Sequence, residues 1–130
     1  MAVAFEIQCE TAGAERLLVF INGNLFSMTE YGTRLRSLTS QPQSYFGAIS
    51  PDGQRIAFTS NRDGNQEIYV ANSDGSQPVN LTRSPITRDE WPRWSPDGTR
   101  LVFYSWNIAA GPPPERSTSS TQMDRARGSA

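Results

Sequence analysis

Short apolar stretches, separated by turn residues, follow one another along the chain. Between residues 55 and 60, Ile56 and Phe58 alternate with Ala57 and Thr59. Such alternation is typical of a β-strand, because successive side chains of a strand point to opposite faces of the sheet. No stretch combines the sustained apolar spacing and the capping residues of a helix. The pattern therefore predicts an all-β chain.

A repeat built around a Ser-Pro-Asp-Gly turn is the strongest signal. Residues 50–60 recur as residues 95–105, 45 positions later, with seven of eleven residues identical. A weaker match at a spacing of 43 relates Leu25-Phe26 to Ile68-Tyr69 and Leu38-Thr39 to Leu81-Thr82. A period of this length, made of short apolar runs and turns, is typical of one four-stranded blade of a β-propeller.

The turn residues of the repeat have separate physical roles. Pro51 presets its own backbone angle, Asp52 can accept hydrogen bonds from nearby groups, and Gly53 can take the left-handed conformation that closes a hairpin. Asp97 and Gly98 have the same roles in the second copy. We therefore interpret both aspartates as turn-stabilising residues.

The pattern predicts a partial β-propeller of consecutive four-stranded antiparallel blades. Residues 1–42 form a first, divergent blade, 43–84 a complete blade and 85–106 half a blade. The complete blade is expected to have strands at roughly 46–49, 55–60, 67–71 and 78–81. The other strands are expected at 17–21, 25–28, 35–38, 91–94 and 100–105, with a further candidate at 3–7.

Residues 107–130 are expected to be a disordered tail. From Ala109 onward the chain has no aromatic residue and no Val, Ile or Leu. Such a segment cannot offset its own ordering entropy by burying apolar surface.

The residue types that are missing exclude several kinds of chemistry. The chain has 12 Arg, no Lys and no His, and Cys9 is its single cysteine. It therefore offers no Ser-His or Cys-His pair, no imidazole metal ligand and no internal disulfide. We expect no catalytic activity, no cofactor and no metal site.

Charge and hydropathy exclude further classes. The net charge of −1 provides no basic field for nucleic acid. No apolar run approaches the roughly 18 residues of a membrane-spanning helix, so membrane insertion is not expected. The first ten residues contain Glu6 and Glu10 and no cation, unlike a secretory signal. The sequence does not indicate the cellular compartment.

Two segments resemble the repeats of TolB-type β-propellers, which are WD40-like. They are Arg93-Trp94-Ser95-Pro96-Asp97-Gly98-Thr99-Arg100-Leu101-Val102-Phe103 and Thr59-Ser60-Asn61-Arg62-Asp63-Gly64-Asn65-Gln66-Glu67-Ile68-Tyr69-Val70. The resemblance implies a propeller of about six blades that binds proteins or peptides. In multidomain relatives such a propeller stands beside a serine peptidase domain. The bacterial TolB proteins are periplasmic partners of a lipoprotein, so a periplasmic location is implied by this resemblance alone.

The chain is short for such a ring. Six blades need about 260 residues at ~43 each, whereas this sequence supplies about two and a half blades. Missing blades would leave exposed strand edges and apolar faces. We therefore consider a truncated product, a ring completed by self-assembly or by another chain, and an open stack of sheets.

Acidic residues give weak candidates for chemistry. Asp63 and Asn65 could supply oxygen ligands, but the spacing of a calcium loop is absent. Glu67, Asp89 and Glu90 could be imagined as a carboxylate pair for glycoside hydrolysis, but nothing in the sequence fixes the separation that this reaction needs. We assign no catalytic residue, cofactor site or metal site.

The residues that we expect to contact a partner are charged or aromatic and lie in loops or beside them. Trp and Arg are over-represented at binding hot spots, and loops on a rigid scaffold commonly bind partners. Trp94 is expected to pack between blades, and for Trp91 both packing and surface roles remain open. The partner-binding candidates are Arg62, Asp63, Arg88, Asp89, Trp91 and Arg93.

Three functions from different classes follow. The leading prediction is a non-catalytic TolB-like propeller segment that binds a protein or peptide. The second is an accessory propeller part of a serine hydrolase or peptidase whose catalytic domain lies elsewhere. The third is a fragment without function.

Overall fold

A computed structural model describes residues 6–9, 16–40, 43–111 and 118–122 of the chain. In these residues every regular element is a β-strand, and no helix has the length and apolar character that crossing a membrane would require. The strands are β1 Glu6–Cys9, β2 Arg16–Ile21, β3 Asn24–Thr29, β4 Arg36–Ser37, β5 Ser44–Ile49, β6 Arg55–Ser60, β7 Glu67–Asn72, β8 Val79–Asn80, β9 Thr87–Trp94, β10 Arg100–Asn107 and β11 Thr118–Gln122.

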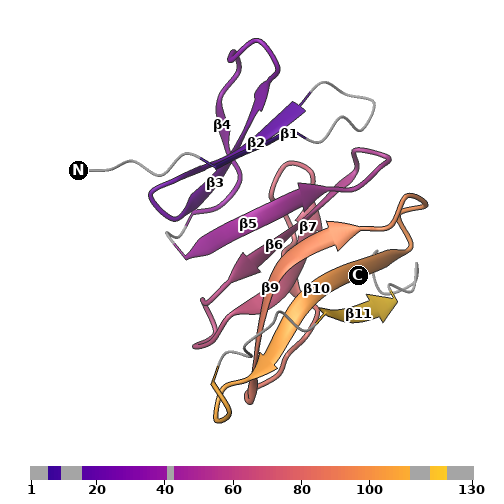
Figure 1. Cartoon of the computed structure of the whole chain (residues 1–130). Coiled ribbons are helices and arrows are strands. Elements are labelled where there is room, and N and C mark those ends of the chain that lie inside the picture. Colours follow the sequence, from indigo (N-terminus) through magenta and orange to yellow (C-terminus); the bar gives the residue numbers. More distant parts are fainter. Residues whose placement is uncertain (1–5, 10–15, 41–42, 112–117, 123–130) are drawn as a thin grey trace.

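The strands form three antiparallel sheets that follow one another in chain order (Figure 1). The first two sheets have four strands each, in the orders β1-β2-β3-β4 and β5-β6-β7-β8. The third has the order β11-β10-β9. Within each sheet, strands that are neighbours in sequence pair with one another, as in the blades of a propeller. The prediction of an all-β chain with consecutive four-stranded antiparallel sheets is confirmed.

The middle sheet is covered on both faces, because its side chains alternate between two cores. Ile56 and Phe58 of β6 join the core toward the first sheet, whereas Ala57 joins the core toward the third. The first core contains Leu18, Phe20, Leu25, Leu38, Ile49, Ile56, Phe58, Tyr69 and Ala71. The second contains Ala57, Ile68, Val70, Leu101 and Phe103, with Leu81 and Trp94 packed against it.

Both Ser-Pro-Asp-Gly segments form the predicted turns. Asp52 Oδ1 accepts hydrogen bonds from Ser50 Oγ at 2.6 Å and from the backbone N–H two residues later at 3.0 Å. Asp97 accepts the corresponding bonds at 2.6 and 3.0 Å, and these bonds lower its pKa to about 2. Gly53 and Gly98 have φ angles of 72° and 70°. The interpretation of these aspartates as turn-stabilising residues is confirmed.

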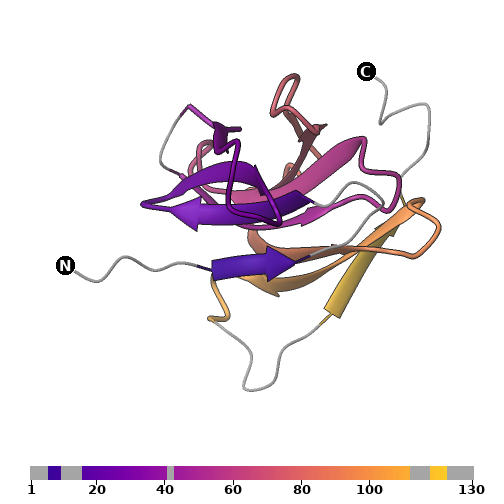
Figure 2. The ribbon, with the colours of Figure 1, turned by 90° about the horizontal axis from the view of Figure 1, so that it is seen from above.

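Part of the expected tail is ordered. Strand β11 pairs with β10 over five residue pairs, from Arg100 opposite Gln122 to Tyr104 opposite Thr118, and flanks it on the side away from β9 (Figure 2). The structure therefore differs from the expected disorder over Thr118–Gln122, because backbone pairing needs no apolar side chains and β10 offers an open edge. The expectation for 112–117 and 123–130, and for the first part of the candidate strand at 3–7, lies outside the described residues.

Candidate functional site

Two loops on the same edge of the second and third sheets are fastened together by one side chain. The loop of residues 61–66 joins β6 to β7, and residues 81–86 lead from β8 into β9. Asn65 Nδ2 lies 2.7 Å from the carbonyl oxygen of Ser84 and 2.5 Å from that of Thr87. The backbone N–H of Asp89 donates to Gln66 O at 2.9 Å. We call residues 61–66 and 81–88 the loop end.

The buried carboxylate of Glu67 accepts hydrogen bonds from residues of both loops. Glu67 accepts hydrogen bonds from the backbone N–H of Ser84 at 2.9 Å, from Asn65 Nδ2 at 3.0 Å and from Thr82 Oγ1. Burial raises the pKa of Glu67, and the nearby negative charge of Asp89 adds to this. The partners of Glu67 are all groups that hold the loops in place, so its role here is structural.

In the loop end, the Arg62 side chain is held by two aromatic rings and by a hydrogen bond. Its guanidinium carbon lies 4.7 Å from the centre of the Tyr69 ring and 5.5 Å from that of Phe58. Its Nε–H donates to Ser60 Oγ at 3.0 Å. The cation–π contacts and the hydrogen bond together restrict the position of the guanidinium group.

Asp63 follows Arg62 but is bound on the other side by polar groups of β7 and β8. The Tyr69 hydroxyl donates to Asp63 Oδ2, and Asn80 Nδ2 lies 3.3 Å from the same oxygen. These bonds hold the pKa of Asp63 below its ordinary value, so this exposed carboxylate is charged at neutral pH. Burial, and then the bond to Asp63, raise the pKa of the Tyr69 phenol.

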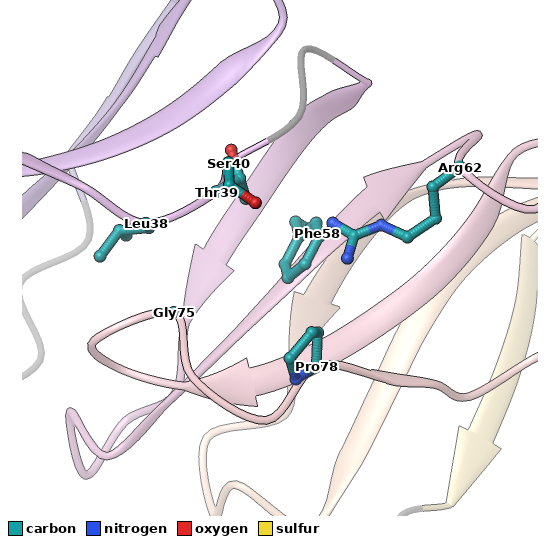
Figure 3. A pocket seen from close by; sticks show the side chains of 7 residues that line it. All are labelled: Leu38, Thr39, Ser40, Phe58, Arg62, Gly75 and Pro78. Carbon is teal, nitrogen blue, oxygen red and sulfur yellow. The ribbon is translucent and has the colours of Figure 1, made fainter.

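A pocket of about 330 Å³ opens beside Arg62, between the first and second sheets (Figure 3). One wall comes from the segment that follows β4, and the other comes from β6 and the turn between β7 and β8. Figure 3 shows the guanidinium group of Arg62 directed over the Phe58 ring toward the first wall. The lining residues are Leu38, Thr39, Ser40, Phe58, Arg62, Gly75 and Pro78.

The structure separates the predicted partner-binding residues into different surroundings. Arg62 and Asp63 lie together on the loop end, and exposed Arg88 lies near them at the start of β9. Asp89 is buried, because its strand position points it into the protein, so it does not belong to an exposed rim. Exposed Arg93 lies near the opposite end of β9 from Arg88. Of the predicted partner-binding residues, Asp89 is therefore buried and Arg93 lies away from the loop end, and their roles in binding stay predictions.

Trp91 packs against another aromatic residue. Its ring stacks on that of Phe46 at a centroid distance of 3.7 Å. Both residues occupy β-bulges with positive φ, 61° for Trp91 and 35° for Phe46, and they are 45 positions apart, as the repeat requires. A bulge changes the direction in which side chains point, and here the two bulges accompany the stacked pair. Trp94 packs between sheets as predicted, and its Nε1–H donates to Ala48 O at 3.1 Å.

The acidic candidates serve the fold in the described part of the chain. Glu67 and Asp89 are both buried and interact electrostatically, but Glu67 is occupied by loop groups. No group of three or more His, Cys, Asp or Glu residues that could hold a metal ion occurs among the residues described. Asn65, which the sequence offered as an oxygen ligand, instead directs its amide nitrogen toward the carbonyl oxygens of Ser84 and Thr87.

Sequence reasoning missed most of the pocket. The sequence relates Leu38-Thr39 only to the equivalent pair of the next repeat, and no pattern marks Pro78 as a site residue. No signal in the sequence brings the segment after β4 against a turn 35 residues later, since their contact depends on how two sheets stack.

Comparisons with known proteins relate this fold to propellers. No protein-family model and no curated protein sequence matches the chain. Among solved structures, a TolB-type protein of Agrobacterium tumefaciens matches 93% of this chain and 46% of its own, with a TM-score of 0.79 and 22% identity. TolB of Acinetobacter baumannii matches 95% of this chain and 31% of its own, with a TM-score of 0.72 and 18% identity.

A peptidase has a similar region. An acylaminoacyl peptidase matches 90% of this chain and 25% of its own length, with a TM-score of 0.57 and 11% identity. The chain thus spans less than half the length of each of these three structures. At these identities the likeness concerns the fold, and the chain has the fold of a partial TolB-like β-propeller.

Proposed function

We propose that the chain is a non-catalytic propeller module that binds a protein or peptide through the loop end. The observation that carries this proposal is the fastening of residues 61–66 to residues 84–87 by Asn65. Loops held in one arrangement before binding lose little conformational entropy when a partner arrives. Loops on a rigid scaffold are also where propellers and other folds commonly place their binding residues.

The loop end has the mixed character of a recognition surface. Ile86 exposes 62% of its surface, and its neighbours Arg83 and Arg88 are also exposed. Asp63 adds a negative charge that Tyr69 and Asn80 hold in position. An apolar anchor surrounded by charged groups fits a partner with an apolar side chain and charges of both signs.

The test is binding of the labelled 130-residue chain to an array of immobilised peptides of random sequence. We expect a subset of peptides to bind, and we expect Ile86→Asp and Arg88→Glu each to weaken that binding about tenfold or more. Leu35→Asp is the matched control, because Leu35 is a similarly exposed aliphatic residue in the first sheet's outer turn. Failure of every peptide to bind, or equal losses in the control, would contradict the proposal.

A second candidate is a propeller part that serves a peptidase domain on another chain. The observation in its favour is the match to the acylaminoacyl peptidase. This candidate and the first share the expectation that the chain alone turns over no substrate, because it has no His or Lys and its buried Glu67 is engaged in loop contacts. Hydrolysis of ester, peptide, glycoside or phosphate substrates that disappears in Glu67→Gln or Asp89→Asn would contradict both.

A further inference from the structure

The pocket beside Arg62 has one cationic end and an apolar body. Arg62 lies at the loop end, whereas Leu38, Phe58 and Pro78 supply carbon surface. No carboxylate is among the described residues that line it. A volume of about 330 Å³ is at the lower end of the range for ligand sites. The pocket therefore suits one small group rather than an extended peptide.

Arg62 is prepared to bind an anion. Its Nε–H is already bonded to Ser60 Oγ, and its guanidinium carbon lies over the rings of Tyr69 and Phe58. Within the described part of the chain, no group accepts a hydrogen bond from its two terminal Nη groups. A guanidinium group held in a fixed plane can offer two parallel N–H donors to the two oxygens of a carboxylate.

The opposite wall supplies further donors. Thr39 Oγ1 accepts the backbone N–H of Leu25 at 2.9 Å, which leaves the Thr39 hydroxyl proton able to donate. Ser40 adds a second hydroxyl group to the lining. Asp63, the residue after Arg62, is outside the lining and is bound by Tyr69 and Asn80. Asp74, the residue before Gly75, is also outside the lining and is bonded to Ser76.

The repeat itself does not require an arginine at this position. The residue 45 positions after Arg62 is Asn107, which occupies the corresponding end of β10. The residue 43 positions after Ser40 is Arg83. The equivalent positions of the next repeat therefore carry different groups, and the combination of Arg62 with two hydroxyl groups is specific to this pocket.

We propose that this pocket binds a carboxylate that is attached to a small apolar group, with the C-terminal residue of a peptide as its source. Arg62 would bind the carboxylate, and Leu38, Phe58 and Pro78 would contact the apolar side chain. For its peptide source this inference rests on the proposed function, which it deepens. A free small carboxylic acid has the same chemistry and is the other source to be tested.

The experiment is an NMR titration of the ¹⁵N-labelled 130-residue chain with three probes. They are N-acetyl-Gly-Gly-Leu with a free carboxylate, the same peptide with a C-terminal amide, and isovalerate. We expect the acid to bind at least about tenfold more tightly than the amide, since the amide loses the charge-assisted bonds. The amide signals of Ser40 and Gly75 should shift on binding, because both residues line the pocket.

Variants separate the charge from the fold. Arg62→Gln should remove the preference for the acid, and Arg62→Lys should retain only part of it, because lysine lacks the planar pair of donors. Asp63→Asn should strengthen binding of the acid, because it removes a nearby negative charge. Arg100→Gln is the control, since Arg100 is an exposed arginine in the third sheet. The spectrum of each variant shows whether it is folded.

The outcomes distinguish this inference from the proposed function. Equal binding of the acid and the amide, or shifts confined to other surfaces, overturns the carboxylate pocket and leaves a peptide-binding loop end standing. Tight binding of isovalerate in a chain that binds no peptide of the array supports the pocket, assigns it to free acids and contradicts the peptide-binding function.

Discussion

Gly75 and Gly32 occupy equivalent positions of the repeat, 43 residues apart, in very different surroundings. Both have positive φ, 86° and 74°. A Cβ atom at Gly75 would lie 2.0 Å from the carbonyl oxygen of Leu38, whereas at Gly32 it would meet nothing within 4 Å in the described structure. Both glycines therefore provide a left-handed backbone conformation, but only Gly75 also permits close contact between two sheets.

We expect Gly75→Ala to lower the free energy of unfolding by about 2–4 kcal/mol, and Gly32→Ala by about 1 kcal/mol. Both variants strain the backbone, but only Gly75→Ala must also displace the backbone at Leu38. Urea unfolding of the two variants measures the difference. Equal losses would show that the turn between β7 and β8 does not pack against Leu38.

Glu67 makes stability depend on pH in a specific direction. Because burial raises its pKa above the ordinary value of 4.5, the folded state binds the proton more tightly than the unfolded state does. The stability that this preference contributes is fully present below the unfolded pKa and is lost as the pH rises through the folded pKa. Hence Glu67→Gln should gain stability relative to the wild type between about pH 4 and pH 7.

Urea unfolding at these two pH values tests this expectation. The amide oxygen of the substituted side chain can still accept bonds from Ser84 and Asn65, so the loops should stay in place. Glu30→Gln, at an exposed carboxylate, is the control for the loss of a charge alone. A Glu67→Gln variant that becomes less stable relative to the wild type as the pH rises would contradict the direction of the shift.

At element scale, the strands with regular alternation could be predicted from the sequence. Residues 55–60 were predicted as a strand and form β6, and the Ser-Pro-Asp-Gly turns were predicted with their hydrogen-bonding roles. Strand β9 begins at Thr87, whereas the sequence predicted a start at residue 91. The first residues of β9 are polar, and buried Asp89 is one of them, so the pattern of apolar positions does not reveal them. A pattern of apolar positions cannot reveal a buried carboxylate or a bulge such as that at Trp91.

Part of the candidate site could also be predicted from the sequence, and part could not. Arg62 and Asp63 were predicted because they are charged residues in a turn-rich loop. The pocket was not, because its walls come from segments that meet only when the first and second sheets stack. The burial of Asp89 and the position of Arg93 near the far end of β9 have the same origin, since both depend on packing and on the length of β9.

Strand β11 gives a prediction of its own. Deleting residues 112–130 removes the partner of β10 and returns its outer backbone groups to water. We expect the melting temperature to fall by a few degrees, about the effect of 1 kcal/mol in a domain of this size, and the amides of β10 to exchange faster. Substituting Arg125 and Arg127 by Gln is the control for loss of charge. An unchanged melting temperature and unchanged exchange would mean that β11 adds nothing to the third sheet.

At the scale of the whole molecule, the middle sheet holds the described structure together. It contributes to both cores, through Phe58 on one face and Ile68 on the other, and it connects the pocket to the loop end. The first and third sheets each contact it, and β5 touches strands of both. Function at the loop end requires this stack to form in the isolated chain, because Asn65 and Glu67 position the loops only when the sheets are in place.

Native-state hydrogen exchange followed by NMR on the 130-residue chain tests this claim most directly. Amides in β6 and β7, which lie between the two cores, should exchange the slowest, and those of β3 and β4 should exchange considerably faster. Exchange of β6 and β7 at the rates of an unfolded peptide, or no faster exchange in β3 and β4 than in the middle sheet, would contradict a stack organised around the second sheet.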